Sequence, residues 1–137
     1  MDFKNIHIGQ MIKERVSESD IDILRICKFF TTSEHEIEKM YSFKSIDSEV
    51  LLRWCKLLDY DFFRIYSQHL ILYSPMIPSQ YSRESALPRF KKNIYTKEII
   101  SFIINMIEVG EKTKTQVIEE YRIPKTTLHR WISKYKP

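Results

Sequence analysis

"YRIPKTTLHRWISKY", residues 121–135, has apolar side chains at intervals that predict the fold of the second half of the chain. With Lys114 as the first position of a twenty-residue window, apolar side chains fall at the fourth, eighth, tenth, fifteenth and eighteenth places: Val117, Tyr121, Ile123, Leu128 and Trp131. Two short helices that cross around a tight turn need inward side chains from both helices and one from the turn. This spacing predicts a helix-turn-helix, with Ile123 in the turn.

Signals for helix starts and ends agree with that prediction. A supporting helix should begin after Thr96 and end at Gly110, since glycine suits the left-handed position that follows a helix. Thr113 and Gln116 have capping-box spacing at the start of the next helix, and Pro124 opens the last one, where its missing N–H costs nothing. The supporting helix should bury Ile99, Phe102, Ile103 and Met106.

The final helix should turn its polar and basic side chains outward. The early part of such a helix enters the major groove of DNA in helix-turn-helix proteins. We expect four residues to read bases: Lys125, Thr126, His129 and Arg130. Phosphate contacts fall near helix starts and on the far flank, which indicates Lys114, Thr115, Thr127 and Lys134. The alternative is an amphipathic helix with a solvated basic face.

The first half of the chain also has helical periodicity and no strand-like alternation. Five short helices are expected within residues 1–74. Asp20 should cap the second helix, Ser33 and Glu36 have capping-box spacing at the start of the third, and the fourth and fifth should start after Asp47 and from Asp61. Inward positions are Ile8, Ile12, Val16, Ile23, Cys27, Phe30, Ile37, Met40, Tyr41, Val50, Leu51, Trp54, Leu57, Leu58, Phe62, Tyr66 and Leu70. We see no internal repeat.

The expected fold is therefore all-α, with two small helical domains. A five-helix bundle occupies residues 1–74, a Pro-containing linker residues 75–92 and the helix-turn-helix domain residues 93–137. The end of the linker is basic, at Arg89, Lys91 and Lys92. These side chains could form an arm on phosphate or in a minor groove, or belong to a solvated tether.

Charge is distributed unevenly along the chain. The net charge of +4 is the sum of −2 for residues 1–74 and +6 for residues 75–137. Clustered cations gain free energy by releasing counterions from phosphate backbones. A polyanion-binding surface is therefore expected in the second half.

Composition argues against several other classes of protein. Two glycines leave no glycine-rich phosphate loop or nucleophile elbow, and no apolar run is long enough for a bilayer. Cys27 and Cys55 lack the paired spacing of zinc or redox sites, and His7, His35 and His69 are scattered singly. We expect a cytoplasmic protein, nucleoid-associated if prokaryotic, with no metal, no cofactor and no membrane partner.

Residues 96–136 resemble the DNA-binding region of insertion-sequence transposases, which have a similar "TTLHRW"-like recognition helix. The resemblance covers about a third of the chain and implies recognition of transposon-end repeats by the outward residues of the last helix. Two positions depart from the pattern: Arg122 stands where glycine is often found, and Ile118 fills a place usually kept small.

Residues 6–72 are more weakly similar to five-helix domains of the phage-repressor type. The segment that would read DNA, "TSEHEIEKMY", carries Glu34, Glu36 and Glu38, which would repel phosphate. We therefore expect this half to be structural or dimerising. Tyr60 and Phe63 belong to an aromatic cluster that either fills the core or forms a protein interface.

A transposase enzyme would add a catalytic α/β domain with three metal-binding carboxylates, for which 137 residues leave no room. The expected function is non-catalytic, sequence-specific binding of double-stranded DNA. Such a protein is either a subunit that marks transposon ends for a catalytic transposase partner or a transcription regulator. A homodimer is a further expectation. The alternative from another class is a helical adaptor that binds proteins and not DNA.

Overall fold

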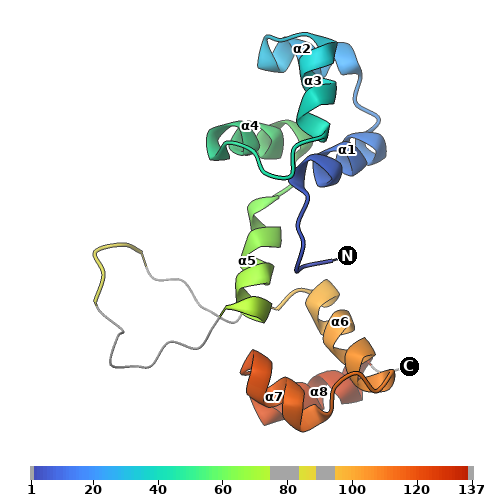
Figure 1. The fold of residues 1–137 in the computed structure, drawn as a ribbon, viewed down its shortest axis with the longest axis vertical. Helices are drawn as coiled ribbons and strands as arrows, with labels where there is room; N and C mark the ends of the chain where they lie inside the picture. Colours follow the sequence, from blue (N-terminus) through green and yellow to red (C-terminus); the bar gives the residue numbers. More distant parts are fainter. Residues whose placement is uncertain (1, 75–83, 89–94, 136–137) are drawn as a thin grey trace. The chain divides into compact units, whose positions relative to one another are not determined.

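The computed structural model describes residues 2–74, 84–88 and 95–135. Within these residues it contains helices and no strand, so the all-α prediction is confirmed (Figure 1). No described helix is long and apolar enough to cross a membrane. The helices are α1 (Ile8–Ser19), α2 (Ile23–Phe30), α3 (Glu34–Tyr41), α4 (Ser48–Leu58), α5 (Phe63–Tyr73), α6 (Lys97–Glu108), α7 (Lys114–Tyr121) and α8 (Lys125–Tyr135).

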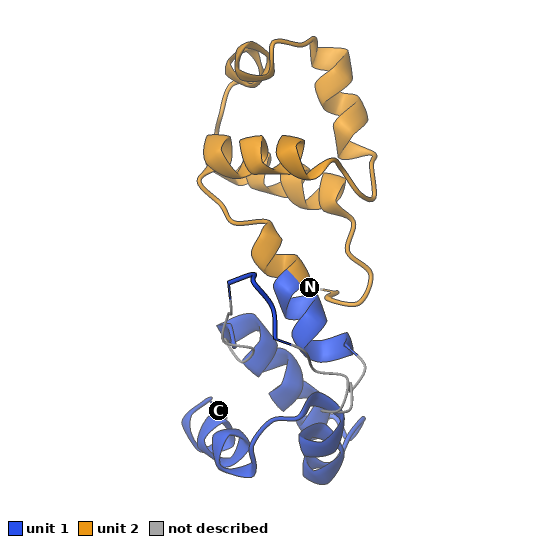
Figure 2. Ribbon diagram, turned by 90° about the vertical axis from the view of Figure 1, so that its left-hand side faces the viewer, with its two compact units in different colours: residues 1, 67–137 blue, residues 2–66 orange. Residues whose placement is uncertain are grey.

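The chain divides into two compact units, coloured separately in Figure 2. The first unit comprises residues 2–66, and the second comprises the described residues from Ser67 onward. This division falls within α5, whereas the sequence analysis places it in a linker at residues 75–92. The expected linker arm, Arg89, Lys91 and Lys92, lies outside the described residues.

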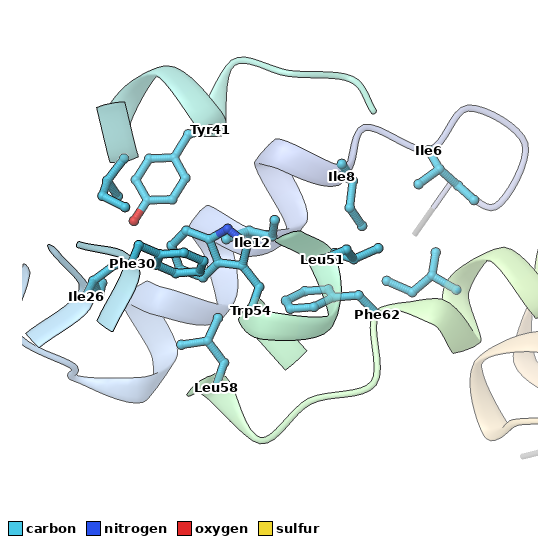
Figure 3. Packing of buried hydrophobic residues seen from close by; sticks show 12 residues of the cluster. Ile6, Ile8, Ile12, Ile26, Phe30, Tyr41, Leu51, Trp54, Leu58 and Phe62 are labelled. Carbon is cyan, nitrogen blue, oxygen red and sulfur yellow. The ribbon is translucent and has the colours of Figure 1, made fainter. Parts of the chain in front are cut away.

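Trp54 of α4 occupies the centre of the first unit's core and is fully buried. The rings of Phe30 and Tyr41 lie beside its indole, with centroids 4.5 and 6.1 Å away (Figure 3). The expected inward positions found buried here are Ile8, Ile12, Phe30, Ile37, Tyr41, Leu51, Trp54, Leu58 and Phe62. On α2 the prediction is partly wrong, because Ile26 is buried with Phe30 whereas Ile23 and Cys27 are half-buried.

The cap of α2 and the buried face of α5 also differ from prediction. Asp22, not Asp20, caps α2 by accepting a hydrogen bond from the Leu24 N–H, and Asp20 ends α1 in the left-handed conformation at φ 53°. On α5, Leu70 is 62% exposed, so its predicted inward position is wrong. The buried face of α5 instead carries side chains at i, i+3 and i+7: Ile65, Gln68 and Leu72.

The structure also reveals a matched pair of segments that the sequence analysis missed. Residues 23–31, ILRICKFFT, and residues 51–59, LLRWCKLLD, share leucine, arginine, cysteine and lysine at corresponding positions. Both end in a left-handed residue, Thr31 at φ 53° and Asp59 at φ 49°. The amide that follows each donates back to the cysteine carbonyl, at 3.0 Å from Thr32 and 3.1 Å from Tyr60. The two segments therefore end their helices in the same way.

Candidate nucleic-acid interface

Three helices form the frame of the second unit, and side chains cap the starts of α6 and α7. The Thr96 hydroxyl accepts from the Ile99 N–H at the start of α6, and Gly110 follows α6 at φ 82°. At the start of α7, Thr113 Oγ1 accepts from the Gln116 N–H at 3.1 Å, and the Gln116 side chain accepts from the Thr113 N–H at 2.8 Å. The predicted helix starts and the capping box are confirmed, which fixes the chain on either side of the α6–α7 connection.

The five inward positions predicted for the helix-turn-helix are all buried. Tyr121 of α7 donates its hydroxyl to Met106 Sδ of α6 at 3.7 Å, and Tyr95 packs edge-on against Trp131 of α8 at 4.8 Å. Burial raises the pKa of both the Tyr95 and Tyr121 phenols. On α6, Phe102 is half-buried rather than buried. The core of this unit thus holds α8 against α6 and α7.

The turn between α7 and α8 has a residue in a strained conformation. Arg122 follows α7 at φ 54°, in the left-handed region where glycine is usual. Its guanidinium Nη2 donates to the carbonyl of Ser74, at 3.3 Å, just beyond α5. Thr96 makes a second link to α5 by donating its hydroxyl to the Gln68 side-chain oxygen at 3.1 Å. The end of α5 therefore belongs to this unit, which sequence reasoning missed.

The outward face of α8 carries most of the predicted contact residues. The predicted residues that are exposed on α8 are Lys125, Thr126, His129, Arg130 and Lys134, and Ser133 and Tyr135 are exposed beside them. Thr127, expected at a phosphate, is half-buried. Residues 125–135 contain three cations and no acidic residue, and none of these cations has an acidic partner within the described residues. An uncompensated positive surface of this kind attracts polyanions.

Lys114 and Thr115 are exposed in the first turn of α7, as predicted. The free N–H groups of a helix start carry a partial positive charge, so Lys114 adds to a site that already favours anions. Nearby, Lys112 donates a hydrogen bond to Glu120, which raises the pKa of the lysine. Because Lys112 is paired with Glu120, it adds no uncompensated charge to the positive surface formed by Lys114 and the cations of α8.

The first unit presents a different surface. Glu34, Glu36 and Glu38 are all exposed on α3, so the acidic face expected from the sequence is present. Tyr60 is 39% exposed and packs on Phe62 at 4.8 Å, and Phe63 is half-buried against the core. Both predicted interface aromatics thus contact their own unit. The described residues contain no group of three metal-ligating side chains that could hold an ion.

No protein-family model, curated protein or solved structure matches this chain. What the second unit can bind is therefore inferred from its own residues.

Proposed function

We propose that the second unit binds double-stranded DNA, with α8 in the major groove. The observation that carries the proposal is that one side of α8 is packed on α6 and α7 while its other side exposes three cations that have no acidic partner among the described residues. Helix α8 is eleven residues long, and a helix of about 10–12 Å diameter fits a groove about 12 Å wide.

Within this proposal the exposed residues divide into two groups. Arg130 offers a bidentate donor pair to guanine, while Lys125, Thr126 and His129 reach neighbouring base edges. Lys114, Thr115 and Lys134 position the unit on phosphates, and Thr127 contributes less because it is half-buried. Base contacts supply sequence preference, and phosphate contacts supply affinity that depends on salt.

The resemblance of residues 96–136 to transposase DNA-binding regions supports one proposal for the biological role. We propose a non-catalytic subunit that marks transposon ends for a catalytic transposase. A transcription regulator would use the same surface. The DNA sequence that the protein prefers distinguishes the two roles. Selection of random duplexes on the full chain should recover one preferred sequence, and a match to transposon-end repeats would favour the first role.

A salt titration tests DNA binding directly. Binding of the selected duplex should give a log–log slope of several units, because each neutralised phosphate contributes roughly −0.9. The control variant is Lys13→Ala, which removes an exposed cation from α1 of the first unit and should leave the salt slope unchanged. A protein-binding adaptor would instead bind the duplex weakly, with no sequence preference and a small salt slope. That result would end the proposal.

A further inference from the structure

A groove in the first unit lies between the matched segments of α2 and α4. It has a volume of about 310 Å³ and is open to solvent. Its lining residues are Arg25, Lys28, Phe29, Lys56 and Leu57. Lys28 and Lys56 occupy corresponding positions of the two segments, as do Phe29 and Leu57. The groove is therefore lined by two apolar side chains and by cations from both helices.

The cations of this groove have no acidic partner of their own. None of Arg25, Lys28 and Lys56 forms an ion pair within the described residues, and all three are exposed. Lysines in the last turn of a helix can be explained by the helix dipole, and Lys28 and Lys56 are so placed. Arg25 is not, because it is the third residue of the eight-residue helix α2.

The matched arginines show how the two segments have diverged. Arg53 donates to the carbonyl of Phe29 at 2.6 Å, and its guanidinium lies over the rings of Phe29 and Phe30 at 5.1 and 4.9 Å. It therefore joins α4 to the end of α2. Arg25, at the corresponding position of α2, is exposed and lines the groove.

We propose that this groove is the docking site for a short acidic segment of a partner protein, one that presents an apolar side chain flanked by carboxylates. The apolar side chain lies against Phe29 and Leu57, and the carboxylates accept hydrogen bonds from the three cations. Charge complementarity of this kind sets partner choice, and charge-assisted hydrogen bonds to carboxylates are stronger than neutral ones. The proposal is independent of DNA binding by the second unit.

Long polyanions fit the groove less well than a short segment. Residues 2–66 hold ten Lys or Arg against twelve Asp or Glu, a net charge of −2, and α3 exposes three glutamates. A duplex would meet this repulsion along its length, whereas a short segment meets the cationic groove alone. A phosphate backbone also has no apolar side chain to place against Phe29 and Leu57.

The acidic helix α3 of a second copy of the chain also fits the groove less well than a segment of a partner protein. Helix α3 carries the exposed Glu34, Glu36 and Glu38, but its apolar residues Ile37 and Tyr41 are buried and Met40 is half-buried. It has no exposed apolar side chain to place against Phe29 and Leu57. A partner segment of separate origin supplies both features.

The test uses the full chain and a random-peptide phage library. Peptides selected on the wild type should carry Asp or Glu around a Leu, Ile or Phe, and should bind in fluorescence anisotropy as synthetic peptides. The double variant Lys28→Glu with Lys56→Glu should weaken binding by about tenfold or more. The matched control, Lys13→Glu on α1, should leave it unchanged. Replacing the apolar residue of the peptide with serine should weaken binding severalfold.

Several results would overturn the proposal. One is a selection that yields no peptide able to distinguish wild type from the double variant, and another is equal binding of the serine peptide. Duplex DNA could also compete with the peptide, and the double variant could lose peptide and DNA binding equally. That pair of results would assign the groove to binding of DNA phosphates. Loss of self-association in sedimentation, without peptide binding, would assign it to a second copy. If the double variant does not fold by circular dichroism, Lys28→Gln with Lys56→Gln replaces it and should show a smaller loss in the same direction.

Discussion

The amide of Gly9, at the start of α1, donates to the carbonyl oxygen of Phe43 at 2.9 Å, in the loop that follows α3. The neighbouring Ile8 N–H donates to the Lys44 carbonyl at 3.0 Å. Two of the four N–H groups that a helix start leaves without a partner are thus satisfied by another part of the chain. A Cβ added at Gly9 would lie 2.4 Å from the Tyr41 carbonyl oxygen and 2.6 Å from those of Met40 and Phe43.

Gly9→Ala should therefore destabilise the first unit by about 3 kcal/mol or more, because backbone carbonyls cannot move aside as a flexible side chain can. Urea denaturation followed by circular dichroism measures the change. The control is Gly110→Ala, at φ 82° with nothing within 4 Å of the added Cβ. It should cost only the left-handed backbone penalty, about 1 kcal/mol. Equal losses for the two variants would contradict the close approach of Gly9 to the loop.

Stability at high pH should depend on Tyr41. Burial raises the pKa of its phenol from 10.0 to about 12, and the charge of Glu38 adds to the effect. The folded protein then holds this proton more tightly than the unfolded chain does. The corresponding stability is fully present below pH 10 and is lost as the pH rises towards 12.

Tyr41→Phe removes this titrating group and should make the loss of stability above pH 10 less steep. Some loss remains, because burial also raises the pKa values of Tyr66, Tyr95 and Tyr121. Urea midpoints for wild type and variant across this pH range provide the measurement. Parallel curves for the two proteins would show that Tyr41 does not titrate as its burial requires.

The capping box of α7 should contribute measurably to the second unit. Thr113→Ala removes the acceptor for the Gln116 N–H and should cost about 1 kcal/mol of stability. Thr115→Ala is the matched control, since Thr115 is an exposed threonine two positions along the same helix. It should change stability by less than about 0.5 kcal/mol. A negligible effect of Thr113→Ala would mean that α7 is held by its packing alone.

Alanine substitutions of Arg130 and Lys134 should change DNA binding in different ways. Both are exposed on α8, one turn apart, but the proposed contact of Arg130 is to a base and that of Lys134 to a phosphate. Arg130→Ala should cost about 1–3 kcal/mol on the preferred duplex and relax base preference at one position. Lys134→Ala should weaken all duplexes alike and lower the magnitude of the salt slope by about 1. The reverse pattern would require a different orientation of the helix.

Sequence spacing predicted the core of the helix-turn-helix because that core is local. The positions from Val117 to Trp131 lie within two adjacent helices and one turn, so helical periodicity and the start signals at Thr113 and Pro124 determine which side chains face inward. By the same reasoning, the exposed face of α8 followed once its buried face was known. Whether this face binds DNA is a separate question, which stays a prediction.

The features that sequence reasoning missed depend on contacts between distant segments. Nothing near Gly9 in the sequence indicates the loop carbonyls after α3, and nothing near Leu70 shows that the buried face of α5 passes through Gln68. The prediction of the residue that caps α2 was wrong for another reason. Asp20 and Asp22 both suit a cap, and only the backbone conformation, left-handed at Asp20 and extended at Asp22, separates them.

The turn before α8 provides the last prediction, because Arg122 combines a strained backbone with a hydrogen bond to Ser74. Arg122→Ala removes the hydrogen bond and keeps a Cβ at φ 54°, whereas Arg122→Gly removes the hydrogen bond and the Cβ together. The glycine variant should therefore be the more stable of the two, by about 1 kcal/mol. Thermal and urea denaturation of the pair measure this difference. If alanine is as stable as glycine, residue 122 leaves the left-handed region in solution, and α8 meets α7 through a turn of different geometry.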